Sequence, residues 1–163
     1  MRLRFPPSPA RPFLQKLITA GLSTADPYQA LIKHVALDRH SLIVGRRTYD
    51  LSHIDRIIAI GAGKASARMA QALEAALGTR LDDGLVIVKT GHTLPTKRIA
   101  VLEAGHPIPD RAGLHATQRL LHLIQRLTPR DLLIVFSSER AKIHVVTCEK
   151  TSVRRPGATP SSE

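Results

Sequence analysis

One stretch of the sequence, from Ile54 to Gly78, constrains the fold more strongly than any other part of the chain. It opens with an apolar run at 57–60, which is followed by the short turn Gly61–Lys64. The next segment is rich in alanine, and its apolar residues recur at the spacing of one helical face: Ala65, Met69, Ala72, Leu73 and Ala76. The stretch therefore predicts a strand, a tight glycine turn and a helix in direct succession.

The predicted turn has the features of an anion-binding site. The first turn of a helix presents unpaired N–H groups and a partial positive charge. Gly61 and Gly63 let the backbone approach a ligand closely, and Lys64 adds a full positive charge at the same place. A phosphate group suits such a turn. The alternative is that the glycines only shape a sharp turn and that Lys64 is solvated, and the pattern alone leaves both interpretations open.

The rest of the chain alternates, in part, between apolar strands and helices. The pattern predicts strands at 85–88, 99–102 and 132–136 and helices near 14–21, 27–35 and 116–127. Gly45–Arg47 and Asp82–Gly84 are expected to be turns. Such alternation is typical of a layered α/β sheet, mostly parallel, with helices on both faces. No helix fits between Val88 and Ile99, so either a loop crosses over there or the neighbouring strand runs antiparallel.

Polar residues and glycines follow each of the four predicted core strands. In open α/β sheets, ligands bind beyond the carboxyl ends of the strands. We therefore expect the segments 61–64, 89–92, 103–106 and 137–138 to converge on one edge of the sheet. They supply these candidate binding residues: Gly61, Gly63, Lys89, His92, His106 and Ser138.

Two common nucleotide motifs match the glycine turn poorly. A Walker A loop needs a hydroxyl residue after its lysine, and Ala65 stands there. A dinucleotide fingerprint needs a third glycine where Ser66 stands, and an acid at the end of the next strand, which ends at Lys89. NAD binding is therefore disfavoured. His92 and His106 lie on different predicted loops without a joining cysteine or carboxylate cluster, so no metal site is predicted.

The charge and composition limit the partners that the chain can have. A net charge of +11 invites a nucleic-acid hypothesis, but aromatic residues make up only 3% of the sequence. The composition therefore disfavours a base-stacking surface, and attraction of small anions fits the charge equally well. The single cysteine, Cys148, excludes an intramolecular disulfide and favours a reducing, cytoplasmic location. No apolar run approaches membrane-spanning length.

Four segments together resemble one known family. They are AIGAGKASARMAQALE at 59–74, GLVIVKTGH at 84–92, VLEAGHPIPDRAG at 101–113 and LTPRDLLIVFSS at 127–138. In this order and spacing they are similar to the class II glycerate kinases, the glycerate 2-kinases whose members carry a C-terminal MOFRL domain. The GAGKA and GHPIPD motifs are specific in combination, and either alone would be weak. Some members have carried the label hydroxypyruvate reductase.

The resemblance implies a Rossmann-like domain and ATP-dependent phosphorylation of D-glycerate to 2-phosphoglycerate with Mg²⁺. The catalytic lysine that has been proposed for the family matches Lys64, which would stabilise charge on the transferred phosphoryl group. By the same analogy we count Ser66 and Asp110 with the six residues above as candidate nucleotide- or substrate-binding residues. The alternatives are a noncatalytic module that binds RNA or another anion, and an NAD(P)-dependent hydroxypyruvate reductase.

The resemblance stops after Ser138. The family continues there into a glycine-rich loop, whereas this chain continues with Glu139-Arg140-Ala141-Lys142. We therefore divide the chain into a disordered leader at 1–11, an incomplete glycerate-kinase domain at 12–138, and an unrelated, partly disordered tail at 139–163, in which 143–147 could add a strand. A frameshift or truncation would explain the change. A chain of this kind is expected to be inactive alone, and a separate chain that carries the missing part is a candidate partner.

Overall fold

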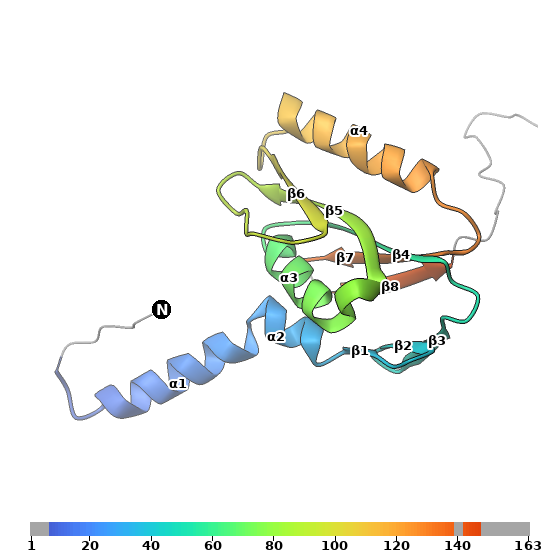
Figure 1. The fold of residues 1–163 in the computed structure, drawn as a ribbon. Coiled ribbons are helices and arrows are strands. Elements are labelled where there is room, and N and C mark those ends of the chain that lie inside the picture. The colour runs from blue at the N-terminus through green and yellow to red at the C-terminus, as the bar shows by residue number, and fades with distance from the viewer. Residues whose placement is uncertain (1–6, 139–141, 148–163) are drawn as a thin grey trace, which may run out of the picture.

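A five-stranded sheet forms the centre of the molecule (Figure 1). The computed structural model describes residues 7–138 and 142–147. The strand order is β6-β5-β4-β7-β8, with β4 at Arg56–Ala62, β5 at Leu81–Lys89, β6 at Ile99–Ala104, β7 at Asp131–Ser137 and β8 at Lys142–Thr147. The strands β4 to β7 pair in parallel, and β8 runs antiparallel to β7. The predicted α/β fold with a mostly parallel sheet is confirmed.

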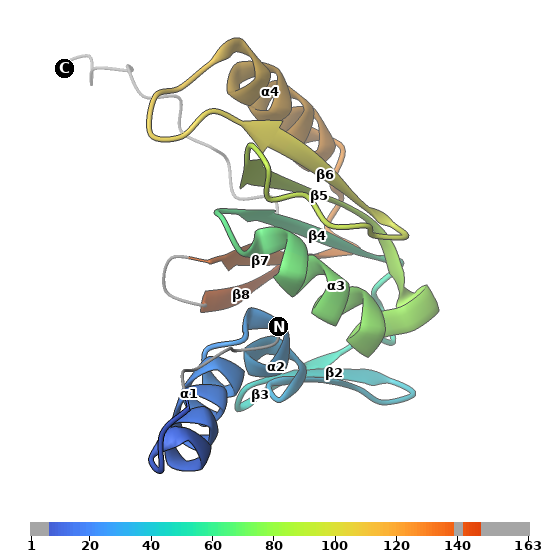
Figure 2. The same ribbon diagram turned by 90° about the vertical axis from the view of Figure 1, so that its left-hand side faces the viewer.

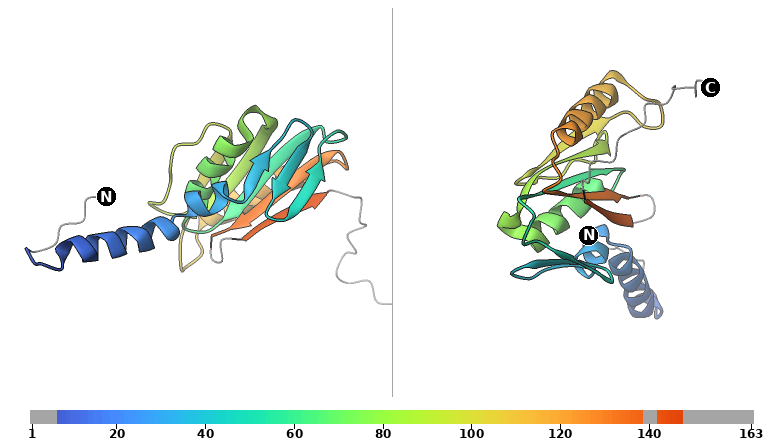
Figure 3. Two further views of the ribbon diagram at one scale, coloured as in Figure 1. Left: turned by 90° about the horizontal axis from the view of Figure 1, so that it is seen from below. Right: turned by 90° about the vertical axis from the view of Figure 1, so that its right-hand side faces the viewer.

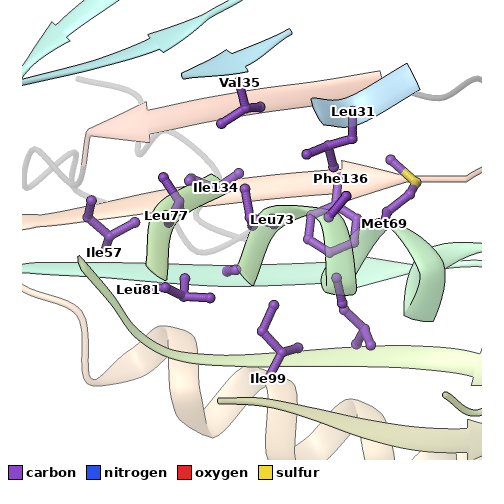
Figure 4. Close-up of a cluster of buried hydrophobic side chains, with 14 of the residues drawn as sticks. Leu31, Val35, Ile57, Met69, Leu73, Leu77, Leu81, Ile99, Ile134 and Phe136 are labelled. Carbon is purple, nitrogen blue, oxygen red and sulfur yellow. The ribbon is translucent and has the colours of Figure 1, made fainter. Parts of the chain in front are cut away.

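Helices cover both faces of this sheet, as the sequence predicts. On one face, α3 (Ser66–Leu77) packs Met69, Leu73 and Leu77 onto apolar side chains of the strands in the main core cluster (Figure 4). On the other face, α4 (Arg111–Gln125) contributes Leu120, Leu123 and Ile124 to a smaller cluster around Ile58, Ile60 and Leu133. The central strands read as continuous apolar runs because side chains on both of their faces are buried.

The connection between β5 and β6 is a loop crossover, which decides between the two alternatives left open by the sequence. The loop lies along α3 and is attached to it by side chains (Figure 2). The Glu74 carboxylate accepts hydrogen bonds from the N–H groups of residues 97, 98 and 99 at 2.6–2.9 Å. Gln71 Nε2 donates to the Pro95 carbonyl at 2.9 Å. The polar side of α3 thus holds in place a crossover that has no helix of its own.

The N-terminal part adds two helices and a small antiparallel sheet beneath α3 (Figures 1 and 3). The helices are α1 (Arg11–Thr24) and α2 (Pro27–Ile32), and the sheet consists of β1 (Val35–Leu37), β2 (Ser41–Val44) and β3 (Arg47–Asp50). The Asp26 carboxylate accepts the Tyr28 N–H at 3.0 Å and caps α2. Leu31, Val35 and Leu42 are buried in the main core cluster, so α2 and the small sheet pack onto the central part, whereas α1 contributes no buried residue.

Four sequence predictions about local structure are wrong. The turn expected at 61–64 is shorter than predicted, because Gly61 and Ala62 still belong to β4. Asp82–Gly84 is not a turn but part of β5, because β4 and β5 pair through a register irregularity between Ile57 and Ile58. There, the Asp82 carboxylate accepts the Ile57 N–H at 2.8 Å, and a Cβ on Gly84 would lie 2.6 Å from the Ala59 carbonyl oxygen. The acid and the glycine therefore serve strand pairing.

The other two errors concern the N-terminal region. The second helix ends at Ile32 rather than reaching residue 35, because Val35 already pairs with Val44 in the small sheet. Of the predicted turn at 45–47, only Gly45 and Arg46 form the turn, and Arg47 starts β3. Gly45 has a positive φ of 62°, which suits a tight hairpin.

The two ends of the chain lie partly outside the described residues. Residues 1–6, most of the predicted leader, and 139–141 and 148–163, most of the predicted tail, are among those not described. The strand expected at 143–147 is present as β8, and its Ile143 and Val145 pack against the main core cluster. The proposed domain boundaries stay predictions. Within the described residues, no helix is long and apolar enough to cross a membrane.

Candidate functional site

The carboxyl ends of the four parallel strands surround one cavity of about 480 Å³. This size lies within the usual range for small-molecule sites. The lining residues come from the ends of β4, β5 and β6 and from the residue that follows β7: Ala62, Gly63, Lys64, Ala65, Ile87, Val88, Lys89, Ala104, Gly105, His106 and Ser138. Segments far apart in the sequence therefore meet at one edge, as the sequence predicts (Figure 2).

The glycine turn is fastened to both neighbouring strands. The Gly63 N–H donates to the Ile87 carbonyl of β5 at 3.0 Å, and the Ser138 N–H donates to the Ala62 carbonyl of β4 at 3.2 Å. Gly63 has a φ of 117°, which L side chains rarely adopt, and a Cβ there would collide with the Ser138 hydroxyl. Only glycine satisfies this geometry, so the turn has a defined shape before any ligand arrives.

Positive charge gathers at this cavity. Lys64 is exposed at the turn that precedes α3, and Lys89 is half-buried at the end of β5. Both line the cavity together with His106 and Ser138, and no lining residue is a carboxylate. The start of α3 adds the partial positive charge of a helix N-terminus. A small anion, such as a phosphate or a carboxylate, is the ligand that this lining would attract.

The same lining does not fit a magnesium ion held by the protein itself. Mg²⁺ takes oxygen ligands and usually one or two carboxylates. The polar side chains of the cavity are two lysines, a histidine and a serine. Within 7–138 and 142–147, no three His, Cys, Asp or Glu side chains are grouped as metal ligands. The Mg²⁺ that the resemblance implies therefore has no ligand set among the residues described.

Asp110 shapes the cavity from outside. Its carboxylate accepts the Gly113 N–H at 2.7 Å and so caps α4. Backbone hydrogen bonds from Gly105 and Gly113 lower the pKa of Asp110 below its usual value. A Cβ on Gly105 would lie 2.9 Å from the Asp110 Cγ, so this carboxylate packs against the loop that carries His106.

Four of the predicted site residues do not line the cavity. Gly61 is buried in β4 against Phe136, and Ser66 is buried in the first turn of α3. His92 is exposed on the crossover loop, and Asp110 is the capping residue described above. Gly63, Lys64, Lys89, His106 and Ser138 do come together.

Some lining residues were missed because they carry no chemical signal. Ile87, Val88 and Ala104 are apolar strand residues, and they form the cavity walls only because parallel strands end together. Gly105 stands inside the predicted loop 103–106, next to His106. Gly105 is the first residue of the GHPIPD motif and follows directly after β6, and this position is the sequence signal that points to it.

The fold and the cavity together define an α/β domain with a cavity lined by cationic side chains at the carboxyl ends of its parallel strands. Residues 13–139 match the family model described as a domain of unknown function, DUF4147. The chain therefore belongs to the DUF4147 family.

Several named proteins are similar to this chain. The chain is 31% identical over 123 residues to the glycerate 2-kinase of Pyrococcus horikoshii, with 76% of this chain and 27% of the relative covered. It is 35% identical over 94 residues to the D-glycerate 2-kinase of Thermotoga maritima, covering 57% and 22%. An Agrobacterium vitis protein named "Putative hydroxypyruvate reductase" is 33% identical over 129 residues, covering 79% and 26%. The resemblance found in the sequence motifs is thereby confirmed.

Solved structures of relatives share this fold. A crystal structure of a Pyrococcus horikoshii protein matches with a TM-score of 0.69 and 29% identity over 81% of this chain and 29% of that one. A crystal structure of glycerate kinase from Thermotoga maritima matches with a TM-score of 0.55 and 29% identity, covering 76% and 28%. The chain thus spans about a quarter of the length of these relatives.

Proposed function

We propose that this chain carries the phosphate-binding half of a glycerate 2-kinase active site, in which ATP is the phosphoryl donor and D-glycerate the acceptor. The observation that carries the proposal is the convergence of Lys64, Lys89, His106 and Ser138 on one cavity at the glycine turn. Relatives with glycerate kinase names add the substrate class.

Lys64 has the central role in this proposal. Phosphoryl transfer depends mainly on positioned positive charge around the transferred group. Lys64 would neutralise charge on that group, and Lys89 would contribute a second cation from the end of β5. The Gly63, Ser66 and Ser138 N–H groups already donate to backbone carbonyls. The donors that would orient phosphate or carboxylate oxygens are therefore the N–H groups of Lys64 and Ala65 and the Ser138 hydroxyl. Magnesium enters no step, because the described residues offer no ligands for it.

The proposal is tested by ATP binding to the 163-residue chain, measured by isothermal titration calorimetry. A hydrogen bond to a charged group is worth about 1.5–3 kcal/mol. We therefore expect Lys64→Met to weaken ATP binding about tenfold or more, since about 1.4 kcal/mol corresponds to a factor of ten. Lys33→Met is the matched control, because Lys33 is an exposed lysine at the C-terminal end of α2 and does not line the cavity. Equal affinities of the two variants would contradict the role of Lys64.

Turnover requires more than this half-site. Closure of a cleft positions the reactants and excludes water, and this chain spans about a quarter of its kinase relatives. We expect a coupled assay with ATP and D-glycerate to show no turnover above background for the 163-residue polypeptide. Robust turnover would show that this part of the fold suffices for catalysis.

A second candidate function is that of a hydroxypyruvate reductase, which the name of the Agrobacterium vitis relative suggests. The two functions differ in their nucleotide. A titration with NADH and NADPH followed by nicotinamide fluorescence distinguishes them: the kinase proposal predicts no saturable binding, whereas micromolar binding would favour the reductase.

A further inference from the structure

Helix α1 exposes an apolar surface that nothing in the described structure covers. None of its residues is buried. Phe13, Leu17 and Leu22 are 67%, 58% and 50% exposed. Together with Leu14 and Ile18 they lie on one side of the helix, since their spacing follows the helical period. The opposite side carries Lys16, Thr19 and Ser23.

The position of α1 leaves this apolar side free. The helix extends away from the rest of the molecule, and α2 is its neighbour (Figures 1 and 3). Isolated helices of about 12–15 residues are marginal in water, and most helical stability in proteins comes from packing of an apolar face. A helix of 14 residues with this pattern therefore calls for a packing partner.

Two observations indicate what that partner is. The family match begins at residue 13, so α1 belongs to the family domain and is not an addition of this chain. The match covers only 26–29% of these relatives, so most of each relative lies outside the matched part. A second copy of this chain is disfavoured, because α1 carries two basic residues and no acid, and the whole chain has a net charge of +11.

We propose that α1 is a docking helix for the remaining part of the family fold, the polypeptide that follows the matched segment in glycerate 2-kinases. The apolar side formed by Phe13, Leu14, Leu17, Ile18 and Leu22 packs against an apolar surface of that part. The interface holds the two parts together independently of the cavity chemistry, so it is tested by binding and not by activity.

The test is co-expression of the tagged 163-residue chain with the part of Pyrococcus horikoshii glycerate 2-kinase that follows its matched segment. Affinity capture is followed by measurement of the dissociation constant. The wild-type chain is expected to form a one-to-one complex. The double variant Leu17→Glu/Leu22→Glu is expected to bind at least tenfold more weakly, because two charges would be buried in an apolar interface.

The matched control adds the same charges to the other side of the same helix. Thr19→Glu/Ser23→Glu is expected to bind like the wild type, and thermal unfolding of both variants checks that the central sheet is intact. Equal weakening by both double variants, or no complex with the wild type, would overturn the proposal. It would also be overturned if size-exclusion chromatography with light scattering showed the wild-type chain alone as a dimer that Leu17→Glu/Leu22→Glu dissociates.

Discussion

The hydroxyl of Ser66 has an unusual environment. Ser66 is fully buried in the first turn of α3, and its Oγ has no hydrogen-bond partner among the described residues. The backbone N–H of Ser66 donates a hydrogen bond to the Gly63 carbonyl at 3.0 Å. Ser66 therefore contributes to packing. Its hydroxyl lacks a partner there, and this lowers the free energy of unfolding.

Replacement of Ser66 by alanine tests this interpretation. A buried hydroxyl without a partner costs about 1–3 kcal/mol, and alanine removes it without adding volume. We expect Ser66→Ala to leave the free energy of unfolding in urea unchanged or to raise it by about 1 kcal/mol, with ATP affinity unaffected. A loss of both stability and affinity would instead assign the hydroxyl to the binding site.

Gly63 is the residue on which the shape of the turn depends. Its φ of 117° is strained for any L residue, and an added Cβ would collide with Ser138. Residues forced into such backbone regions cost about 1–3 kcal/mol. We expect Gly63→Ala to lower the free energy of unfolding by at least about 1 kcal/mol and to abolish detectable ATP binding.

A matched exposed position provides the control for that change. A Cβ on Gly21 would meet no atom within 4 Å, and the residue lies inside α1, where alanine is the better helix former. Gly21→Ala should therefore retain full affinity and stability. Comparable losses in both variants would show that the turn has no special geometry.

At the scale of elements, α3 does more than cover the sheet. Glu74 accepts hydrogen bonds from three successive N–H groups at the start of β6. Burial alone would raise the pKa of Glu74, but these backbone donors outweigh it and the pKa is lowered. The carboxylate thereby fixes the point at which the crossover loop becomes the edge strand β6.

Removal of this carboxylate should loosen the crossover locally. We expect Glu74→Ala to lower the free energy of unfolding by about 2 kcal/mol, because charge-assisted hydrogen bonds are lost. Hydrogen exchange at the amides of Lys97, Arg98 and Ile99 should accelerate. Unchanged exchange at these three amides, in a variant whose other amides are also unchanged, would contradict the anchoring role.

The sequence was informative about elements wherever local pattern and long-range packing agree. The apolar runs at 57–60 and 132–136 lie within β4 and β7, and the helical period before Gly78 marks α3. The sequence pattern was misleading at Asp82–Gly84. Residues typical of turns stand there at an irregularity in the pairing of β5 with β4, and β4 is distant in the sequence. The short strands β1 and β3 were missed because three or four residues carry too little periodicity.

The candidate site shows the same division. Lys64, Lys89, His106 and Ser138 were found because they stand in the short segments that follow predicted strands, and parallel pairing then brings these segments together. The burial of Ser66 and the capping role of Asp110 were not found, since each depends on which way a side chain points after packing.

At the scale of the whole molecule, one ion pair joins the amino ends of β4 and β7. Arg56 donates to Asp131 through two nitrogens, at 2.8 and 2.6 Å. The Asp131 side chain is 1% exposed, whereas that of Arg56 is 41% exposed. The hydrogen bonds from Arg56 lower the pKa of Asp131 in the folded chain, against the effect of burial.

This pair predicts acid sensitivity. Because the pKa of Asp131 is lower in the folded than in the unfolded chain, its contribution to stability is present above the unfolded value of about 3.9 and is lost as the pH falls through the folded value. We expect Asp131→Asn to lower stability by about 2 kcal/mol at pH 7, with a difference from wild type that shrinks below about pH 4. A difference that stays constant from pH 7 to pH 3 would contradict the linkage.

The central claim is that the glycine turn and the converging strand ends bind an oxyanion. Its most direct test is an NMR titration of the ¹⁵N-labelled chain with inorganic phosphate. The account predicts saturable shifts of the amides of Gly63, Lys64, Ala65, Gly105 and Ser138, which Lys64→Met abolishes. Shifts confined to another basic region, such as Arg46 and Arg47 at the β2–β3 turn, with the amides of the glycine turn unmoved, would contradict it.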